Sequence, residues 1–376
     1  MHQVFKCIHS TLFLANTIKD NKKQFVKCVC VCACSISPFM PKITLDDIYQ
    51  AIPRGCFAKN TLTSLSYLIT DLAILSTAPW VYTNVVANTW NPIVLLAYWN
   101  FYGFFMWCLF AVGHDCGHGT FSNTGWVNAF CGHVAHTPLL VPFWPWARSH
   151  RMHHHKSHPW LIINHNRALY KSIVAPFVMF PMHIIFSHLS LSPFGSNMNH
   201  IECICSTLAI VNFLQILANA CDYNWHTFAL AYGGCYFCFS FWVFMVMYMQ
   251  QHHNGSGSGG SDSSTIIVYN DKTQTWSTLS NSFLHGGLLQ SVDRTYGWGL
   301  DRLQHHITDG HMAHRMFPLD IPHYHLRRAT RHVRQKLKAH CIPQKDKVVH
   351  QNPLDALIQF WCMYLNEDCN ELPPIS

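Results

Sequence analysis

Four long apolar stretches, separated by polar breaks, dominate the hydrophobic pattern of the chain. They cover roughly residues 64–87, 92–113, 204–221 and 227–250. Each is close to the about 20 residues that a helix needs to cross the hydrocarbon core of a bilayer. The polar break at 88–92 is short and joins the first two as a hairpin. The pattern therefore predicts four transmembrane helices.

Two further apolar segments carry too many prolines and polar residues to cross a bilayer. Residues 126–146 contain Gly132, His133 and His136 as well as several prolines, and residues 172–189 contain prolines and histidines. Because unsatisfied backbone groups and polar side chains are costly in hydrocarbon, both segments are predicted to lie along the membrane interface.

The remaining segments are polar or of unusual composition. Residues 1–40 are expected to be a disordered tail, and the Gly/Ser-rich stretch 255–264 is expected to be a flexible loop. A short helix is predicted after Thr44, whose side chain suits the first capping position. We therefore expect one membrane and cytosolic domain over residues 41–340, followed by a C-terminal tail over residues 341–376.

The composition supports a membrane protein. Charged residues are 11% and hydrophobic residues 49% of the 376 residues, whereas a soluble domain has about 25% charged residues. The net charge of +7 suits an anionic cytosolic membrane surface, and the basic segment 327–347 is equally compatible with a solvated helix face. The 17 cysteines lack the spacing of a secreted disulfide framework, which indicates a reducing compartment. No nucleic-acid partner is expected.

Histidine is the most informative residue type, because many of its 28 copies gather in three clusters beside the apolar stretches. The clusters are His114-Asp-Cys-Gly-His118, His150-Arg-Met-His153-His154-His155, and His305-His306 with His311-Met-Ala-His314. Spacings of three or four residues place side chains on one face of a helix. Neutral imidazole is also the commonest metal ligand. The clusters therefore predict one multi-histidine metal centre at the bilayer surface.

A shared metal centre constrains the topology. The three clusters must face one side of the membrane, so the number of crossings between the second and third clusters must be even. Residues 204–221 and 227–250 supply two crossings if 172–189 lies on the surface. The predicted fold class is therefore an all-α integral membrane protein with four transmembrane helices, interfacial helices and a cytosolic cap that carries the histidines.

The number and type of the ligands favour iron. The clusters offer about eight imidazoles against six positions around an octahedral ion, so two irons are expected. Zinc is redox-inert and does not need so many histidines. Asp115 and Asp309 are candidates for holding ring N–H groups of the ligands, whereas His323 and His325 are expected to be structural. A metal transporter is an alternative, but transporters place their ligands inside the spans.

Longer motifs surround the clusters. They are His114-Asp-Cys-Gly-His-Gly-Thr-Phe-Ser122, Ser149-His-Arg-Met-His-His154, Val292-Asp-Arg-Thr-Tyr-Gly297, and His311-Met-Ala-His-Arg-Met-Phe-Pro318 followed by Ile321-Pro-His-Tyr-His325. These motifs resemble the histidine boxes and flanks of the membrane fatty acid desaturases, most closely the methyl-end (delta-12 and omega-3) type. The resemblance extends over roughly residues 41–340.

The resemblance implies an acyl desaturase with two iron ions as cofactor and dioxygen as co-substrate. It implies a multi-pass protein of the endoplasmic reticulum membrane whose boxes face the cytosol. Electrons would come from cytochrome b5 and its NADH-dependent reductase, and no His-Pro-Gly-Gly haem motif occurs in the chain, so the donor is expected to be a separate protein. The substrate would be an acyl-lipid or acyl-CoA, and the resemblance leaves both this choice and the regiochemistry open.

Carried over position by position, the resemblance assigns only histidines to the site. The predicted iron ligands are His114, His118, His150, His153, His154, His252, His305, His311 and His314. No catalytic residue beyond these ligands is assigned.

One position departs from the family pattern. The third box is His-x-x-His-His in the family, but residue 315 is arginine, which offers no lone pair to a metal. Loss of one ligand weakens or removes one iron site unless another histidine replaces it. Three hypotheses follow: an active desaturase, a related hydroxylase or acetylenase on the same scaffold, and a catalytically impaired homologue.

Overall fold

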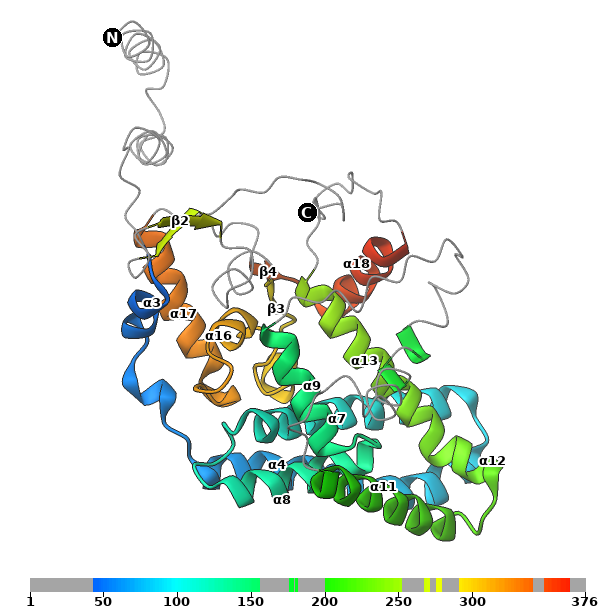
Figure 1. Ribbon diagram of the computed structural model, residues 1–376. Coiled ribbons are helices and arrows are strands. Elements are labelled where there is room, and N and C mark those ends of the chain that lie inside the picture. The colour runs from blue at the N-terminus through cyan, green and yellow to red at the C-terminus, as the bar shows by residue number, and fades with distance from the viewer. Residues whose placement is uncertain are drawn as a thin grey trace, which may run out of the picture.

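The computed structural model describes residues 43–155, 176–178, 180–181, 200–251, 267–270, 275–278, 291–340 and 348–365. Within these residues the protein is mostly helical, with a bundle of long helices and a cap of shorter elements on one side of it (Figure 1). The predicted tail 1–40, the loop 255–264 and most of the predicted interfacial segment 172–189 lie outside the described residues.

The first two predicted crossings form a helical hairpin. The first span, Thr61–Thr89, runs through α4 (Thr61–Ser76), α5 (Ala78–Val81), a π-helical turn η2 (Tyr82–Val86) and α6 (Ala87–Thr89). The second is the single 27-residue helix α7 (Pro92–His118). Asn60 and Asn91 each accept a hydrogen bond from a backbone N–H in the first turn of the helix that follows. Both helices therefore begin at side-chain caps.

The second pair of crossings follows the second histidine cluster. It consists of α11 (His200–Ala220) and of a continuous run of α12 (Trp225–Phe228), the π-helical turn η5 (Ala229–Gly233) and α13 (Gly234–Gln251). Among the described residues, four helices are thus long and apolar enough to cross a membrane. The prediction of an all-α membrane protein with four spans is confirmed.

Helix α7 lies at the centre of the bundle and packs against α4, α8, α9 and α13. Glycine permits the close approach to α13, because a Cβ at Gly103 would lie 2.5 Å from Cβ of Cys238. A hydrogen bond of 2.7 Å from Tyr98 Oη to the carbonyl of Ala231 links the same two spans. Tight packing of small residues is typical of helix interfaces in membranes.

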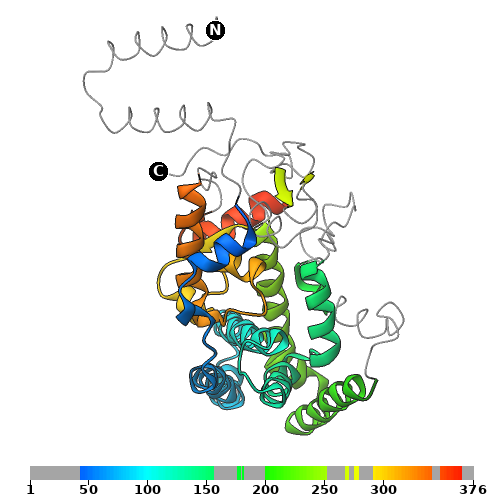
Figure 2. The ribbon, with the colours of Figure 1, turned by 60° about the vertical axis from the view of Figure 1, so that its left-hand side comes forward.

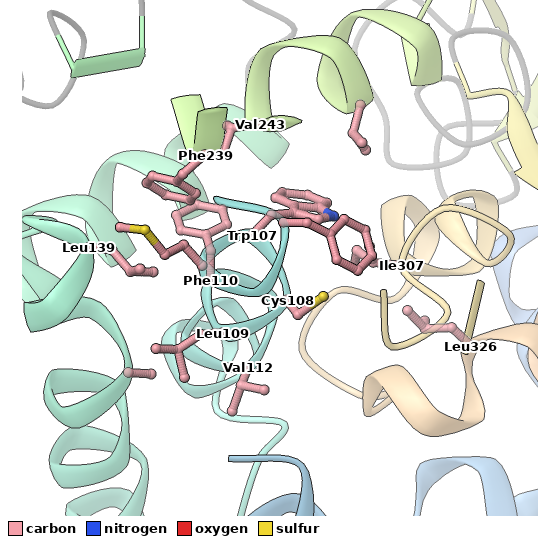
Figure 3. Packing of buried hydrophobic residues seen from close by; sticks show 14 of the residues in the cluster. Trp107, Cys108, Leu109, Phe110, Val112, Leu139, Phe239, Val243, Ile307 and Leu326 are labelled. Carbon is pink, nitrogen blue, oxygen red and sulfur yellow. The ribbon is translucent and has the colours of Figure 1, made fainter. Parts of the chain in front are cut away.

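One cluster of buried apolar side chains joins the bundle to the cap. Figure 3 shows Phe110 of α7 beneath Phe239 of α13, and Ile307 and Leu326 of the cap on the other side of α7. The cap is therefore fixed to the spans by packing as well as by chain connection.

The apolar segment 126–146 forms no span. It folds into α8 (Gly125–His136), the 3-10 turn η3 (Thr137–Leu139) and the start of α9 (Phe143–His155). Pro138 and Pro142 lie between the two α-helices, where proline interrupts the helical hydrogen bonds. Helix α9 rises from the bundle beside α13 and carries the second histidine cluster (Figure 2).

The cap combines the start of the described chain with its last third. Its helices are α3 (Leu45–Ala51), the 3-10 turn η1 (Arg54–Phe57), α15 (Leu300–Leu303), α16 (His311–Met316), α17 (His323–Ala339) and α18 (Pro353–Leu365). Helix α3 begins after Thr44 as predicted. Thr44 Oγ1 accepts from the N–H of Asp47 at 3.1 Å, and Asp47 accepts from the N–H of Thr44 at 2.9 Å, which is a capping box.

In the described part of the chain, four short strands add to the helical fold, and they were not predicted. β1 (Ile267–Asn270) pairs antiparallel with β2 (Thr275–Thr278), and β3 (Asp293–Thr295) pairs in parallel with β4 (Val348–His350). Strands of three or four residues are too short to show an alternating pattern in sequence. The segment predicted as a C-terminal tail, 341–376, contains β4 and α18, and α18 packs on α13 through the fully buried ring of Phe360.

Candidate metal centre

The first histidine cluster occupies the last turn of α7. His114 and His118 are one turn apart, and their Nε2 atoms lie 3.3 Å from each other. Both residues are buried, each with an exposed fraction of 6%. Gly119 then ends the helix with a φ of 75°, a left-handed conformation that favours glycine. The two imidazoles therefore converge on one point at the end of the span.

Two further histidines complete a compact group at this point. His150 comes from α9 and His314 from α16, and their rings lie 4.7 Å from the ring of His114. One ring nitrogen from each of the four histidines can be chosen so that all lie within 4.8 Å of one another. Among the described residues, this is the only group of three or more metal-ligating side chains at such distances.

Two glycines allow α8 and α9 to approach this end of α7. A Cβ at Gly113 would lie 2.1 Å from Cδ2 of His136, and a Cβ at Gly117 would lie 2.9 Å from Cζ3 of Trp146. Distances this short do not occur between real side chains, so larger residues would push α8 and α9 outward. The glycines beside His114 therefore help to bring His150 within reach of the cluster.

The ring of His150 is held by an aromatic neighbour on its own helix. Trp146 stacks on His150 with ring centroids 4.8 Å apart and an angle of 11° between the planes. Arg148, between them in sequence, forms an ion pair with Glu202 at the start of α11. Helix α9 is thus tied both to the cluster and to the third span.

A buried carboxylate caps the helix that carries His314. Asp293 accepts a hydrogen bond of 2.8 Å from the backbone N–H of Met312, in the first turn of α16, and forms an ion pair with Arg334 of α17. Burial raises the pKa of Asp293 to about 6, and Arg334 and the Met312 N–H oppose this rise. The Val292–Gly297 motif thereby positions the third box.

The next residue in the same motif links the last span to the C-terminal helix. Arg294 is fully buried, and its Nε donates to the carbonyl of Met249 at 2.8 Å. Its Nη1 donates to Gln359 Oε1 of α18 at 3.0 Å. The end of α13, the third box and α18 are therefore held in one hydrogen-bonded unit.

The environment of His118 and His314 favours neutral imidazoles. Burial lowers the pKa of His314 well below its ordinary value, and His114 and His118 add to this effect. Neutral rings present lone pairs, as a metal requires. Three buried imidazoles and the partly buried imidazole of His150, at these distances, fit one transition-metal ion, with coordination positions left for other ligands.

Of the other predicted ligands, His305 and His311 lie outside this group of four. The ring of His311 lies 6.1 Å from that of His314. His153 and His154 lie in the last turn of α9, and His252 lies outside the described residues. His305 is buried elsewhere, and its Nε2 lies 2.7 Å from a carboxylate oxygen of Asp71.

Arg315, the departure from the family pattern, is buried beside His314 with an exposed fraction of 8%. Burial lowers the pKa of its guanidinium. In the described part of the chain no carboxylate lies within ion-pair distance of Arg315. A cation therefore occupies the third box where the family has an imidazole.

Several residues that shape the site escaped the sequence analysis. Trp146 and Gly113 carry no chemical signal of their own, because their role depends on packing. Asp71 was missed as well, although it is the only charged residue in the span Thr61–Thr89. An isolated acid in an apolar span is a signal that points to a function.

Sequence similarity to known proteins identifies a family. The family model described as "Fatty acid desaturase" matches residues 89–347. The chain is 33% identical over 333 residues to a Delta(12) fatty acid desaturase of Caenorhabditis elegans, covering 82% of each chain. It is 31% identical over 324 residues to an omega-3 fatty acid desaturase of the same organism, covering 78% of this chain and 74% of the relative.

A plant relative gives the same result. The chain is 32% identical over 346 residues to "Omega-3 fatty acid desaturase, endoplasmic reticulum" of Vigna radiata var. radiata, covering 85% of this chain and 84% of the relative. The matched region includes α7, α9 and α16, which supply the four histidines. The chain therefore belongs to the fatty acid desaturase family and is a membrane oxidoreductase of lipid metabolism.

Proposed function

We propose that the protein is an acyl-lipid desaturase that introduces a double bond toward the methyl end of a fatty acyl chain. The observation that carries the proposal is the buried group of His114, His118, His150 and His314, which three separate boxes build inside an apolar interior. Relatives named as Delta(12) and omega-3 desaturases support the methyl-end assignment.

The proposed cofactor is a pair of iron ions. The group of four would hold one ion, and the proposed ligands of the second are His153, His154, His252 and His311. Bound iron would supply the activation of dioxygen and the removal of two hydrogens. The balanced reaction converts –CH2–CH2–, O2, two electrons and two protons into –CH=CH– and two waters. We propose cytochrome b5, reduced by its NADH-dependent reductase, as the electron donor.

The residues around the cluster orient the ligands and exclude water. Trp146 fixes the plane of His150, and Asp293 fixes the start of α16 beneath His314. The ring of Phe110 packs against that of Trp146, with centroids 5.2 Å apart, and against that of Phe180, with centroids 5.6 Å apart. Such surroundings suit a methylene chain and leave little room for solvent at the reacting carbon.

The proposed location is the endoplasmic reticulum membrane, with the histidine boxes on the cytosolic side. A relative named "Acyl-lipid omega-3 desaturase (cytochrome b5), endoplasmic reticulum", from Arabidopsis thaliana, is 28% identical over 315 residues. Its name supports the acyl-lipid substrate, the donor and the location. The aligned region covers 77% of this chain and 76% of the relative.

A catalytically impaired homologue is the second candidate, and Arg315 is the observation that favours it. A buried guanidinium beside His314 removes one donor and adds a positive charge next to the cluster. Both effects weaken binding of a second iron.

Fatty acid profiling in yeast separates the candidates. Cells would express the full chain, a His314→Ala variant, and a control variant, His226→Ala, at an exposed position in α12 at the start of the last span. New dienoic acids, or trienoic acids from supplied linoleate, should form with the parent chain and the control and disappear with His314→Ala. Hydroxylated products would indicate a hydroxylase instead. No new product from well-expressed parent protein would favour the impaired homologue.

A further inference from the structure

Asp71 of α4 is an ionisable group inside an otherwise apolar span. Its exposed fraction is 2%, and it is the only charged residue between Thr61 and Thr89. A buried charge in a membrane span is costly unless it is paired, and such residues usually serve a function. The partner of Asp71 is His305, 234 positions later in the chain, whose Nε2 lies 2.7 Å from Oδ2 of Asp71.

A second carboxylate–histidine pair lies directly beside the first. Oδ2 of Asp115 accepts a hydrogen bond of 2.7 Å from Nδ1 of His323 and one of 2.9 Å from its backbone N–H. The rings of His305 and His323 are 5.1 Å apart. Tyr67, one turn before Asp71 on α4, meets both rings edge-on at 4.9 Å and 4.7 Å. The two pairs and the tyrosine form one buried unit, which we call the Asp71 clamp.

The Asp71 clamp joins α4, the end of α7 and the segments on both sides of the third box. Asp115 follows His114 directly in the first box. His305 lies in the turn that precedes the third box, and His323 begins α17 after that box. The clamp therefore connects the first span to both sides of the third box and to the end of α7.

The turn that contains His305 has a strained backbone, and the Asp71 clamp helps to hold the turn in this conformation. His305 and His306 have φ values of 57° and 58°, a left-handed conformation that is unfavourable for residues with a side chain. Gln304, just before them, accepts a hydrogen bond of 3.2 Å from Nε1 of Trp107 on α7. The pairing of His305 with Asp71 holds this turn against α4 while Gln304 holds it against α7.

We propose that Asp71 is a positioning residue of the metal centre, acting through His305 and the Asp71 clamp to fix the third box against the first. This proposal rests on the proposed function, because that function requires a metal ion at the four histidines. It assigns His305 to orientation of the site instead of to metal ligation. Removing a carboxylate that holds a metal-ligating histidine typically lowers metal affinity tenfold to a hundredfold, and Asp71 acts in the same direction one contact further from the metal, through His305.

The test compares metal binding by purified full-length variants in lipid nanodiscs. Asp71→Leu removes the carboxylate and makes the span more apolar, so insertion is not impaired. Leu68→Ala, at a buried position one turn away on α4, is the control for lost packing. The readouts are cobalt affinity, the visible spectrum of bound cobalt, iron per chain, and the thermal midpoint.

We expect Asp71→Leu to weaken cobalt binding at least tenfold and to change the cobalt spectrum, with Asp71→Glu restoring part of the affinity. His305→Gln should resemble Asp71→Leu, and the double variant should be no worse than either single variant. Leu68→Ala should lower the thermal midpoint and leave the spectrum unchanged.

Three results would overturn the proposal. One is an unchanged affinity and spectrum in Asp71→Leu. Another is loss of a metal equivalent in His305→Gln but not in Asp71→Leu, which would make His305 a ligand. The third is a parent chain that binds no metal, which would also remove the basis of the proposed function. A parent chain that binds metal but yields no fatty acid product would contradict the proposed function alone.

Discussion

At the scale of single residues, Arg315 is the departure from the family pattern that bears most directly on the proposed metal centre. The chain keeps His311 and His314 of the third box and places a buried guanidinium next to them. Arginine stays protonated in proteins and donates hydrogen bonds only, so it repels a metal ion where an imidazole would bind one. We therefore expect the departure from the family pattern to weaken the proposed second iron site more than the group of four, which keeps all of its histidines.

Replacing Arg315 by histidine should raise the iron content. We expect the purified Arg315→His chain to bind the second of the two proposed irons more tightly than the parent chain, because a neutral donor replaces a cation. Metal analysis of protein loaded with iron under reducing conditions measures this. Arg331→His, on the exposed face of α17, serves as control and should leave the iron content as it is. Equal iron in the parent and in Arg315→His would contradict the expectation.

The buried side chain of His136 also contributes to the dependence of folding stability on acidic pH. Burial lowers the pKa of His136 to about 3, from an ordinary value of 6.5. The contribution of its neutral form to stability is therefore complete above pH 6.5 and is lost as the pH falls from 6.5 toward 3. At pH 5 the loss amounts to about 2 kcal/mol.

His136→Gln should flatten this dependence. Glutamine is of similar size and does not titrate, so the fall in thermal midpoint between pH 7 and pH 5 should be smaller than in the parent chain. Thermal unfolding in detergent at a series of pH values measures it. The same slope in both proteins would mean that His136 is not responsible.

Residue-level chemistry was predictable where the relevant residues are close in sequence. The spacing of His114 and His118 already placed both side chains on one helix face, and the structure brings them together. The pairing of Asp71 with His305 was not predictable, because it joins positions 234 apart. Only the fold brings such residues into contact, and sequence periodicity reports local geometry alone.

At the scale of elements, the site depends on how closely α8 and α9 pack against α7. Gly113 and Gly117 flank His114 and leave room for the rings of His136 and Trp146. The long apolar stretches of the sequence predicted the long helices correctly, but they gave no information about how closely α8 and α9 approach α7. Close packing is set by side-chain shape, which a hydrophobic pattern does not describe.

Gly113→Ala should loosen this contact. The added Cβ would lie 2.1 Å from the ring of His136, so α8 must move, at a cost of about 1–3 kcal/mol. We expect a lower thermal midpoint and weaker cobalt binding. Gly125→Ala is the matched control, because nothing lies within 4 Å of a Cβ at that position. If the Gly113→Ala chain is as stable as the control, α8 can move away from α7 without a loss of folding stability.

At the scale of the whole molecule, the three boxes and α18 lie at the same end of the spans. The last turns of α13 contact both regions: Gln250 Nε2 donates to the carbonyl of Ile307 at 3.1 Å, and Tyr248 Oη donates to that of Met363 at 3.3 Å. Among the described residues between the second and third boxes, α11 and the run from α12 to α13 are long and apolar enough to cross a membrane.

This arrangement predicts the accessibility of two inserted tags in sealed microsomes of the endoplasmic reticulum. A tag fused after Ser376 should be removed by added protease, because the proposed orientation places α18 on the cytosolic side. A tag inserted after Tyr223, in the turn between the last two spans, should be protected until detergent opens the membrane. The reverse pattern would contradict the proposed orientation of the boxes.

The length of α7 has a consequence for how the substrate meets the metal. A helix of 27 residues is about 40 Å long, whereas the hydrocarbon core is about 30 Å thick. If α7 starts at one boundary of this core, the four histidines at its other end stand roughly 10 Å beyond the opposite boundary. A carbon that reacts there has left the lipid. Transfer of a methylene from lipid into an aromatic interior exchanges one apolar surrounding for another, at almost no free-energy cost. The depth at which the acyl chain stops is then set by the shape of the interior and not by its hydrophobicity.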